Sequence, residues 1–483
     1  MGELGDKHWQ ETFRQNILGQ NLTVAGQPVV YADWTASGRA YGPIEQFMTD
    51  QVAPWVANTH TESNWTGGTM TQLYHEARET IKRHVNAGAE DVLICDGTGM
   101  TGVVNKLQRI LGLRVPEHLQ GEQKQARPLV VITHMEHHSN QTSWQECDVD
   151  LAILPANDKG MPDLQHLAKL LEENQHRPLL LGSFTACSNV TGIQTPIHEM
   201  AAIMHQYGGL CLVDYAASAP YVAIDMHPED PDQQLDGVMF SPHKFLGGPG
   251  SCGVLVFNKA LYHNQVPDQP GGGTVTWTNP WGEHHYFDDI ETREDGGTPG
   301  FLQAIRAALA IQVKEAMGVE RIHQAEHRLN GAFFELLDDI PNLHVLAGES
   351  RDRLSIFSLY FDHLHYNLVV RLLNDHFGIQ ARGGCSCAGT YGHLLLGVDQ
   401  DTSRAITCEI DQGNLSHKPG WIRISFHPTT SLEEVRFIGR ALKQIADHGQ
   451  KWAQDYRFDP HRGEYLPLKS EALGQPRLAE FTP

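Results

Sequence analysis

The stretch GVMFSPHKFLGGPG, residues 237–250, decides the fold and points to the chemistry of this chain. Its first four residues, Gly237–Phe240, are typical of a short strand that is buried on both faces. Lys244 follows in a loop rich in glycine. A lysine held in an apolar pocket has a lowered pKa and becomes an amine nucleophile, whereas a lysine in an open loop is merely solvated. Both interpretations stay open from this stretch alone.

Similar short apolar runs occur on both sides of this stretch. They are Val92–Cys95, Leu129–Thr133, Leu151–Leu154, Leu179–Gly182, Gly209–Val213 and Gly253–Phe257. Helical patterns separate most of them, among them Tyr74–Val85, Asp163–Asn174 and Ile197–Gln206. Apolar strands that alternate with helices predict an α/β fold, in which a mostly parallel seven-stranded sheet is sandwiched by helices.

The pattern changes beyond residue 320. Strands are predicted at Leu343–Ala347, Ser355–Phe361 and Trp421–Phe426. An amphipathic helix at Ser431–Ala446 begins with a Ser-Leu-Glu-Glu capping box. This mixture is typical of a smaller α+β domain. The expected parts are an N-terminal arm, a large domain, a small C-terminal domain and an extended tail, at residues 1–30, 31–320, 321–460 and 461–483.

The composition excludes several classes of protein. With 58 acidic and 36 basic residues among 483, the formal charge is −22, so the chain is a poor candidate for binding nucleic acid or an anionic membrane. No apolar run approaches the ~18 residues of a membrane-spanning helix, and the N-terminus does not resemble a secretory signal. Eight cysteines are too few for a disulfide scaffold. We expect a cytoplasmic protein that binds neither nucleic acid nor membrane.

Acidic and glycine-rich segments follow two other strands. Asp214 comes after the apolar run Gly209–Val213, where a carboxylate is poorly hydrated and needs a cationic partner to stay ionised. The alternative for Asp214 is a helix N-cap. Val92–Cys95 leads into the loop Gly97–Gly102, whose small residues let backbone N–H groups approach an anion. A tight turn without a ligand fits this loop as well.

Three histidines and a glutamate follow Leu129–Thr133, in the segment HMEHH at residues 134–138. Their spacing does not match the helical H-x-x-x-H of zinc enzymes, and no further ligand set is apparent. We therefore expect no metal here. An imidazole at the end of a strand could instead stack on a planar ligand.

The four strand ends make sense together as one site. Pyridoxal phosphate requires a Schiff-base lysine, a carboxylate against its pyridinium nitrogen, a phosphate cup and a group on the ring face. Lys244, Asp214, the Gly97–Gly102 loop and His137 supply these groups in that order. The carboxylate would keep the ring nitrogen protonated, so that the ring accepts the electrons left when a Cα–H bond breaks.

Specific motifs also carry a family resemblance. They are Ser-x-His-Lys at residues 241–244 and Glu-His-His-Ser-Asn at residues 136–140, and the matching segments extend from Tyr31–Ser37 to Arg423. In these residues the chain resembles the class-V (fold-type I) pyridoxal-phosphate enzymes, and among them the SufS-like cysteine desulfurases. The resemblance implies a fold-type I transferase with pyridoxal 5'-phosphate as its cofactor.

The resemblance implies roles for residues around the cofactor. Lys244 would form the Schiff base and later move the Cα proton, Asp214 would pair with the pyridine nitrogen, and His137 would stack on the ring. The residues that would hold the phosphate are Thr98, Gly99, Ser241 and His243.

The same resemblance implies how substrate and a second subunit would be bound. Asn189 would lie near the ring hydroxyl and the substrate carboxylate, and Arg423 would grip that carboxylate as a bidentate fork. Arg382 is assigned to the substrate as well. Thr298 would reach the phosphate of the neighbouring subunit, which implies a homodimer with shared active sites.

The segment RGGCSCAG, residues 382–389, matches the family's catalytic-cysteine loop of pattern Arg-x-Gly-x-x-Cys-Ala. Cys387 occupies the catalytic position, and Cys385 is an additional thiol. If the loop is extended, both thiols could approach one site, whereas a turn would separate them. The alternatives are a structural thiol pair or half of a metal site with His393.

Together these residues predict a cysteine desulfurase, which takes sulfur from L-cysteine, releases L-alanine and leaves a persulfide on Cys387. A sulfur-acceptor protein is a further expected partner. The alternative is a related class-V aminotransferase or lyase that acts on another amino acid, with Cys387 not catalytic. Another class of answer is a non-catalytic relative that acts as a scaffold. One departure bears on the substrate: Ala217 stands where the family usually has a Gln that contacts the ring oxygen.

Overall fold

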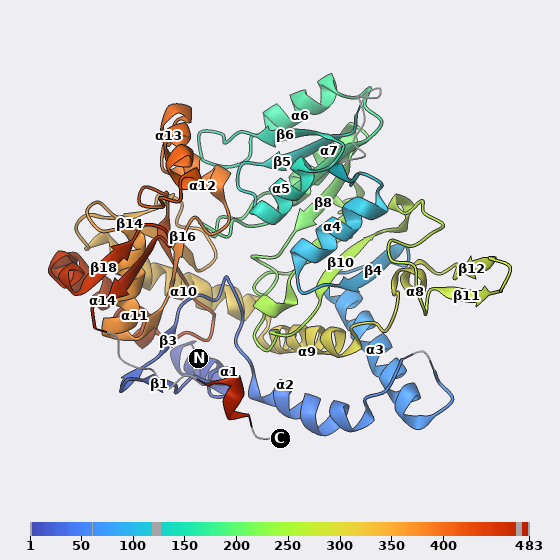
Figure 1. The fold of residues 1–483 in the computed structure, drawn as a ribbon, viewed down its shortest axis with the longest axis horizontal. Helices are drawn as coiled ribbons and strands as arrows, with labels where there is room; N and C mark the ends of the chain where they lie inside the picture. Colours follow the sequence, from blue (N-terminus) through green and yellow to red (C-terminus); the bar gives the residue numbers. More distant parts are fainter. Residues whose placement is uncertain (1, 60, 118–126, 470–475, 482–483) are drawn as a thin grey trace. The chain divides into compact units, whose positions relative to one another are not determined.

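The computed structural model describes residues 2–59, 61–117, 127–469 and 476–481 (Figure 1). The chain forms two compact units. The larger unit contains Thr35–His323, and the other combines Met1–Trp34 with Gln324–Pro483. The N-terminal residues, expected as a separate arm, thus belong to the same unit as the C-terminal part. An ion pair of 2.5 Å between Arg14 and Glu434 ties the two segments together.

The larger unit is built on a seven-stranded sheet (Figure 1). Its strands, in their order across the sheet, are β4 (Asp91–Asp96), β10 (Gly253–Asn258), β9 (Gly237–Phe240), β8 (Leu210–Asp214), β7 (Leu180–Thr185), β5 (Leu129–Thr133) and β6 (Asp150–Leu154). Of these strands β10 alone runs opposite to the other six. All seven correspond to predicted strands, so the mostly parallel α/β sheet is confirmed.

Helices cover both faces of this sheet. The helices of the unit are α2 (Gly42–Phe47), α3 (Trp65–His84), α4 (Met100–Ile110), α5 (His138–Gln145), α6 (Leu164–Glu173), α7 (Ile197–Gln206), α8 (Ile290–Glu294) and α9 (Phe301–Met317). Leu181 of β7 belongs to the apolar cluster formed with α4 and α5. The next residue, Gly182, faces Met204 of α7. Because successive residues of a strand point to opposite faces, α4 and α5 lie on one face and α7 on the other.

A two-stranded hairpin that the sequence analysis did not predict precedes α8. It consists of β11 (Val275–Thr278) and β12 (His284–Tyr286), paired antiparallel. Both strands are short and largely exposed, so they carry little of the apolar pattern by which strands are recognised.

The other unit is an α+β structure. Its main sheet has the antiparallel order β13 (Leu343–Val345), β14 (Ile356–Phe361), β17 (Trp421–Ser425) and β16 (Arg382–Gly384). A parallel pair joins β3 (Val30–Tyr31) to β15 (Ile379–Gln380), and short hairpins are formed by β1 (Thr23–Val24) with β2 (Gln27–Pro28) and by β18 (Tyr456–Asp459) with β19 (Glu464–Pro467). The helices are α1 (Gly2–Arg14), α11 (Tyr366–Phe377), α12 (Gly389–Leu395), α13 (Gln400–Asp411) and α14 (Leu432–Trp452), and α10 (Val319–Asp338) begins in the larger unit.

Apolar residues of α10, α11 and α14 pack with β14 and β17 into one core. Phe333 of α10 lies edge-on to Phe357 of β14, with ring centroids 4.8 Å apart. The capping box of α14 is present, since the Ser431 side chain accepts from the Glu434 N–H and the Glu434 side chain accepts from the Ser431 N–H.

The C-terminal end differs from the expected extended tail. Residues 464–467, inside the segment 461–483, form β19 and pair with β18. Tyr456 and Tyr465 of this hairpin pack against the core of the unit, which holds the segment in place although its sequence is polar. No helix among the described residues is long and apolar enough to cross a membrane.

Candidate active site

Five segments with predicted site residues converge on one edge of the large sheet. Since β10 is antiparallel to both β4 and β9, the six remaining strands share one direction and end at the same edge. The segments that leave this edge contain Thr98 after β4, Lys244 after β9, Asp214 at the end of β8, Asn189 after β7 and His137 after β5. Ligands of open α/β sheets bind beyond the carboxyl ends of strands, so this edge is the candidate site.

Asp214 and Lys244 come from neighbouring strands. Asp214 is 3% exposed, and its Oδ1 accepts a hydrogen bond of 2.8 Å from the Ala216 N–H. Burial raises the pKa of Asp214 to about 6, although the Ala216 N–H and the Lys244 ammonium oppose this. Lys244 is half-buried in the 3-10 turn Pro242–Lys244. Turns and no helix follow Asp214, so the alternative of a helix N-cap is wrong.

The expected phosphate-binding residues form a narrow cradle at the start of α4. The Met100 N–H donates to Ser241 Oγ over 2.9 Å. A Cβ placed on Gly99 would lie 3.0 Å from Ser241 Oγ and 3.4 Å from the His243 ring. Gly99 is the N-cap residue of α4 and has no side chain that could bond to the N–H groups of the first turn. Thr98 beside it is exposed. A helix N-terminus lined by small residues and a hydroxyl group suits a phosphate.

The floor of this cradle is the first residue of β10. Because β10 is antiparallel to its neighbours, Gly253 at its start lies at the edge where β4 ends, opposite Asp96. A Cβ on Gly253 would fall 2.4 Å from the Gly99 carbonyl oxygen. The backbone of the loop therefore rests directly on a glycine.

His137 is the N-cap residue of α5 at the same edge. Its Nδ1 accepts from the Ser139 N–H over 3.1 Å, which leaves the ring proton of a neutral imidazole on Nε2. Ser139 Oγ also lies 2.6 Å from Thr101 Oγ1, so the starts of α4 and α5 are linked. His137 is half-buried.

Glu136 is a buried support beneath this edge. Its Oε1 accepts from the Thr133 hydroxyl over 2.7 Å and from the Thr185 N–H over 2.9 Å, and its Oε2 accepts from Asn140 over 2.8 Å. Burial, with a smaller contribution from the charge of Asp214, raises the pKa of Glu136 to about 7, although its hydrogen bonds to Asn140, Thr185 and Thr133 oppose this. Glu136 therefore ties β5 to β7 and is not exposed as a metal ligand.

Asn189 lies in a tight turn beyond β7. The Ser188 hydroxyl accepts from the N–H groups of Val190 and Thr191, at 3.1 and 3.2 Å. Asn189 itself is 6% exposed. The turn thus presents this amide at the same edge as Asp214.

The two predicted substrate arginines lie in the other unit, directly opposite each other on β16 and β17. Arg423 is buried, with 4% of its side chain exposed, while 51% of the Arg382 side chain is exposed. Asp33 bonds to both: Oδ1 lies 2.9 Å from Arg423 Nη2 and Oδ2 lies 3.0 Å from Arg382 Nε. Burial lowers the pKa of Arg423, and Asp33 opposes that change. Sequence reasoning missed Asp33, although this acidic residue follows the apolar stretch Val29–Ala32.

Cys387 lies in the loop between β16 and α12 and is exposed. The segment is a turn, since the Ala388 N–H donates to the Cys385 carbonyl oxygen over 3.0 Å. Ser386 and Cys387 both have positive φ, at 51° and 55°. Of the two geometries considered from sequence, the turn is therefore present, and the extended loop that would align Cys385 with Cys387 is not.

Two remaining predictions concern His393 and Thr298. The ring nitrogens of His393 lie 2.8 Å from the Gly389 carbonyl oxygen and 2.9 Å from the Ser403 hydroxyl, which gives no support to a metal site with the cysteines. Within the described ranges, no group of three His, Cys, Asp or Glu side chains could hold a metal ion. Thr298 is exposed in the bend before α9, where it stays a prediction.

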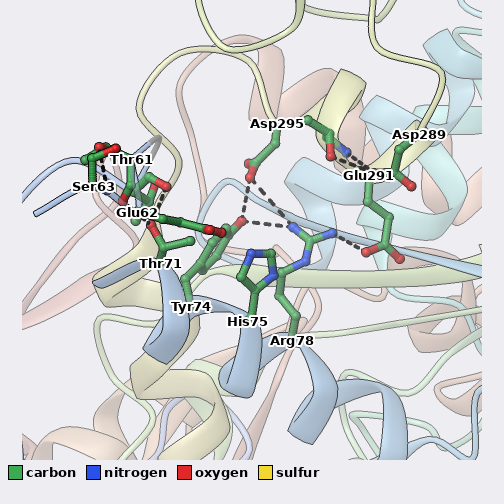
Figure 2. A pocket seen from close by; sticks show the side chains of 12 residues that line it. Thr61, Glu62, Ser63, Thr71, Tyr74, His75, Arg78, Asp289, Glu291 and Asp295 are labelled. Carbon is green, nitrogen blue, oxygen red and sulfur yellow. Dashed lines mark hydrogen bonds and ion pairs between the residues drawn. The ribbon is translucent and has the colours of Figure 1, made fainter. Parts of the chain in front are cut away.

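Away from this edge, a cavity of about 540 Å³ lies between α3, α8 and the residues Thr59, Thr61, Glu62 and Ser63 (Figure 2). Figure 2 shows Arg78 pointing toward Glu291 and Asp295, at 2.6 and 3.7 Å, with the Tyr74 hydroxyl donating to Asp295 over 2.8 Å. None of the predicted site residues lines it. These bonds join α3 to α8, and we assign the cavity no chemistry.

Comparison with known proteins gives a consistent set of relatives. A probable cysteine desulfurase from Halalkalibacterium halodurans is 29% identical over 377 residues, which cover 77% of this chain and 86% of that protein. One from Staphylococcus epidermidis is 28% identical over 437 residues, 89% of this chain and 95% of that protein. A cysteine desulfurase from Synechococcus elongatus is 28% identical, and the match covers 76% of this chain but 55% of that protein.

Solved structures share the fold, and the family follows from the sequence. A cysteine desulfurase from Thermococcus onnurineus matches with a TM-score of 0.72 and 24% identity, over 90% of this chain and 98% of that one. The cysteine desulfurase CsdA from Escherichia coli matches with a TM-score of 0.69 and 21% identity, over 91% and 98% of the two chains. The sequence profile of the class-V aminotransferases matches residues 30–438. The chain belongs to the class-V aminotransferase family.

Proposed function

We propose that this protein is a pyridoxal-phosphate-dependent cysteine desulfurase. The observation that carries the proposal is the placement of buried Asp214 at the end of β8 and of Lys244 in the turn after the neighbouring strand β9, beside the cradle of Gly99 and Ser241. The names of the relatives support the choice of L-cysteine as substrate. These residues form the cofactor site together with His137, His243 and Asn189.

The cofactor site fits pyridoxal phosphate in charge and shape. Asp214 is buried, and the loss of hydration raises its pKa to about 6. A protonated ring nitrogen beside it would stabilise the carboxylate in place of the missing water. A side chain on Gly99 would fill the cradle between Ser241 and His243, which leaves room there for phosphate oxygens. Burial and the Lys244 ammonium lower the pKa of His243 to about 4, so His243 offers a neutral imidazole.

The bound cofactor would supply a sink for the electrons of the substrate Cα–H bond. Lys244 would accept that proton and return one to carbon, and Asp214 would hold the ring nitrogen protonated. Arg423 would bind the substrate carboxylate. The Cys387 thiolate would attack the substrate sulfur, so that an S–S bond forms and the C–S bond breaks with its electron pair going to carbon. A proton on that carbon then completes L-alanine, and the persulfide stays on Cys387.

The first experiment measures alanine release and bound sulfur after the purified protein is incubated with pyridoxal phosphate and L-cysteine. We expect alanine and one extra sulfur atom on the peptide that contains Cys387. Cys387→Ala should lose both by at least ~100-fold, whereas Cys385→Ala should keep them, because the turn separates the two thiols. A Cys387→Ala protein with unchanged alanine release would refute the desulfurase proposal and favour an aminotransferase or lyase.

A second experiment tests the cofactor itself. Lys244→Ala should abolish the visible absorption band that the wild type acquires with pyridoxal phosphate, since no other amine is proposed to condense with the aldehyde. A wild-type protein that stays colourless after incubation with the cofactor would contradict the whole proposal.

The assembly and partners belong to the same proposal. We infer a homodimer in which Thr298 reaches the phosphate of the neighbouring subunit, and an acceptor protein that takes sulfur from exposed Cys387. None of the eight cysteines forms a disulfide, which supports a reducing compartment such as the cytoplasm.

A further inference from the structure

Lys314 on α9 is a buried lysine that the proposed chemistry does not use. It is 3% exposed. Its Nζ donates to the Ala219 carbonyl oxygen over 2.6 Å and also to the Val222 carbonyl oxygen. A buried charged group persists where hydrogen bonds satisfy it, so these two carbonyl groups fix the position of the Lys314 side chain.

The two carbonyl groups lie at the end of a compact segment that starts at Asp214. Within it, the Tyr215 carbonyl oxygen accepts from the Ala219 N–H over 2.7 Å, and the Ser218 carbonyl oxygen accepts from the Val222 N–H over 3.1 Å. Carbonyl groups at the end of such helical turns form the negative end of a dipole, and lysine side chains bind them there. Lys314 is therefore linked to Asp214 through a short, hydrogen-bonded stretch of backbone.

Lys314 also contacts the segment that follows Lys244. Phe245, the next residue along the chain, is 1% exposed. The centroid of its ring lies 5.7 Å from Lys314 Nζ, a distance at which an ammonium group is attracted to the face of an aromatic ring. One side chain thus contacts the segments that follow both Asp214 and Lys244.

His84 and Glu315 complete the surroundings of Lys314. His84 Nε2 lies 3.2 Å from Lys314 Nζ, and His84 Nδ1 lies 3.2 Å from Glu315 Oε1. Burial and the charge of Lys314 lower the pKa of His84 to about 4, although Glu315 opposes this, so a neutral imidazole accepts from the ammonium group. Burial lowers the pKa of Lys314 to about 7, and Glu315 opposes this as well. A neutral amine keeps two N–H groups, so the two carbonyl bonds persist above that pH.

We propose that Lys314 is a positioning residue of the cofactor site, which holds the segment after Asp214 so that this carboxylate stays in place for the ring nitrogen. The proposal rests on the proposed function, in which Asp214 pairs with the ring nitrogen of pyridoxal phosphate. Without Lys314, the carbonyl groups of Ala219 and Val222 would lose their buried donor. Since unpaired buried groups are unfavourable, the segment would relax and take Asp214 with it.

The decisive experiment is a double-mutant cycle on the affinity for pyridoxal phosphate, measured by fluorescence titration of the cofactor-free protein. Lys314→Met removes the N–H donors and keeps an unbranched side chain. We expect this change to weaken binding about tenfold when Asp214 is present and less than about twofold in the Asp214→Asn background, where no carboxylate is left to position. Equal losses in the two backgrounds would overturn the proposal, because a general loss of stability acts alike in both.

The visible absorption band of the loaded protein gives a readout that stability alone does not move. The pH midpoint of this band depends on the charge of the ring nitrogen, which Asp214 controls in the proposed function. Lys314→Met should move the midpoint in the same direction as Asp214→Asn does. A Lys314→Met protein that binds the cofactor with an unchanged midpoint would contradict the proposal.

Hydrogen exchange tests the same contact without the cofactor. In the cofactor-free protein, the amides of Tyr215–Val222 should exchange about tenfold faster in Lys314→Met, whereas those of Val130–Ile132 in β5 should be unchanged. Unchanged exchange in Tyr215–Val222 would show that Lys314 does not hold this segment. Lys169→Met, at a lysine of α6 that is 71% exposed, is the matched control and should change neither the exchange nor the cofactor affinity.

Two outcomes need a second route to the answer. If Lys314→Met does not fold, Lys314→Gln takes its place in the cycle, because its amide keeps a donor in the buried site but is one bond shorter than the lysine side chain. Equal losses in the two backgrounds would then contradict the proposal in the same way. If the wild type binds no pyridoxal phosphate, the proposed function fails, while hydrogen exchange still decides whether Lys314 holds the segment after Asp214.

Discussion

At the scale of single residues, Asp214 is a buried carboxyl group with a raised pKa, as expected of a group that pairs with a cationic ligand. It is 3% exposed and its pKa is raised from 3.8 to about 6, because burial outweighs the Ala216 N–H and the Lys244 ammonium. A carboxyl group whose pKa is higher in the folded than in the unfolded state stabilises the fold below the unfolded pKa, and this contribution is lost as pH rises through the folded pKa.

Asp214→Asn should therefore change the pH dependence of stability in the cofactor-free protein. We expect no difference from the wild type near pH 4 and a more stable variant above pH 6, by up to ~3 kcal/mol since each unit of pKa corresponds to about 1.4 kcal/mol. Melting temperatures between pH 4 and pH 8 measure this. Parallel curves for the two proteins would show that Asp214 carries no such penalty.

Some site residues could be predicted from sequence and others could not, for a physical reason. Lys244 and Asp214 each follow an apolar strand, so local pattern places them at the edge of the sheet. Asp33 acts through Arg382 and Arg423, which lie 349 and 390 residues away along the chain. The apolar stretch before Asp33 is a local signal, but no local pattern records its contacts with the two arginines.

At the scale of elements, the turn Cys385–Ala388 carries backbone strain. Ser386 and Cys387 both adopt left-handed backbone conformations, with φ of 51° and 55°, where an L-residue other than glycine loses about 1–2 kcal/mol. The Trp421 Nε1–H donates to Ser386 Oγ over 3.1 Å. Since strained turns persist where the surroundings hold them, Trp421 helps to keep Cys387 at the exposed tip.

A pair of variants at Ser386 isolates this strain. Ser386→Ala and Ser386→Gly both remove the bond to Trp421 and differ by one methyl group on a residue with positive φ. We expect the Gly variant to be more stable than the Ala variant by about 1 kcal/mol in chemical denaturation. Equal stability would mean that residue 386 is relaxed in solution.

The two ends of α14 differ in how well the local sequence pattern predicts them. The capping box predicted at Ser431 is present, because a cap depends on residues close in sequence. The same helix runs to Trp452 and not to Ala446, and Trp452 stacks on His376 of α11 with ring centroids 4.4 Å apart. A tertiary contact thus extends the helix beyond its local signal.

At the scale of the whole molecule, the proposed chemistry draws on both units. Lys244 and Asp214 belong to Thr35–His323, while Arg423 and Cys387 belong to the other unit. The cofactor residues follow strands of the large sheet. The inferred homodimer adds a third contributor, Thr298 of a second copy.

Mixing two impaired variants tests that shared site. Thr298→Ala should weaken cofactor binding, and Lys244→Ala should be inactive. In a mixed dimer, the Thr298→Ala subunit keeps its own Lys244 and would receive an intact Thr298 from the Lys244→Ala subunit. We expect co-refolded mixtures to regain activity at limiting pyridoxal phosphate, up to about half that of the wild type per mixed dimer. A mixture no better than its components would place Thr298 outside a shared site.

The reversed direction of β10 has a consequence for sequence variation. It brings the start of a strand among the ends of six others, so the backbone of Gly99 rests on Gly253 with no room for a methyl group. Evolution and protein engineering are therefore restricted to glycine at position 253. A larger residue at position 253 would displace the cradle and weaken cofactor binding. The reactive side chains themselves would be unchanged.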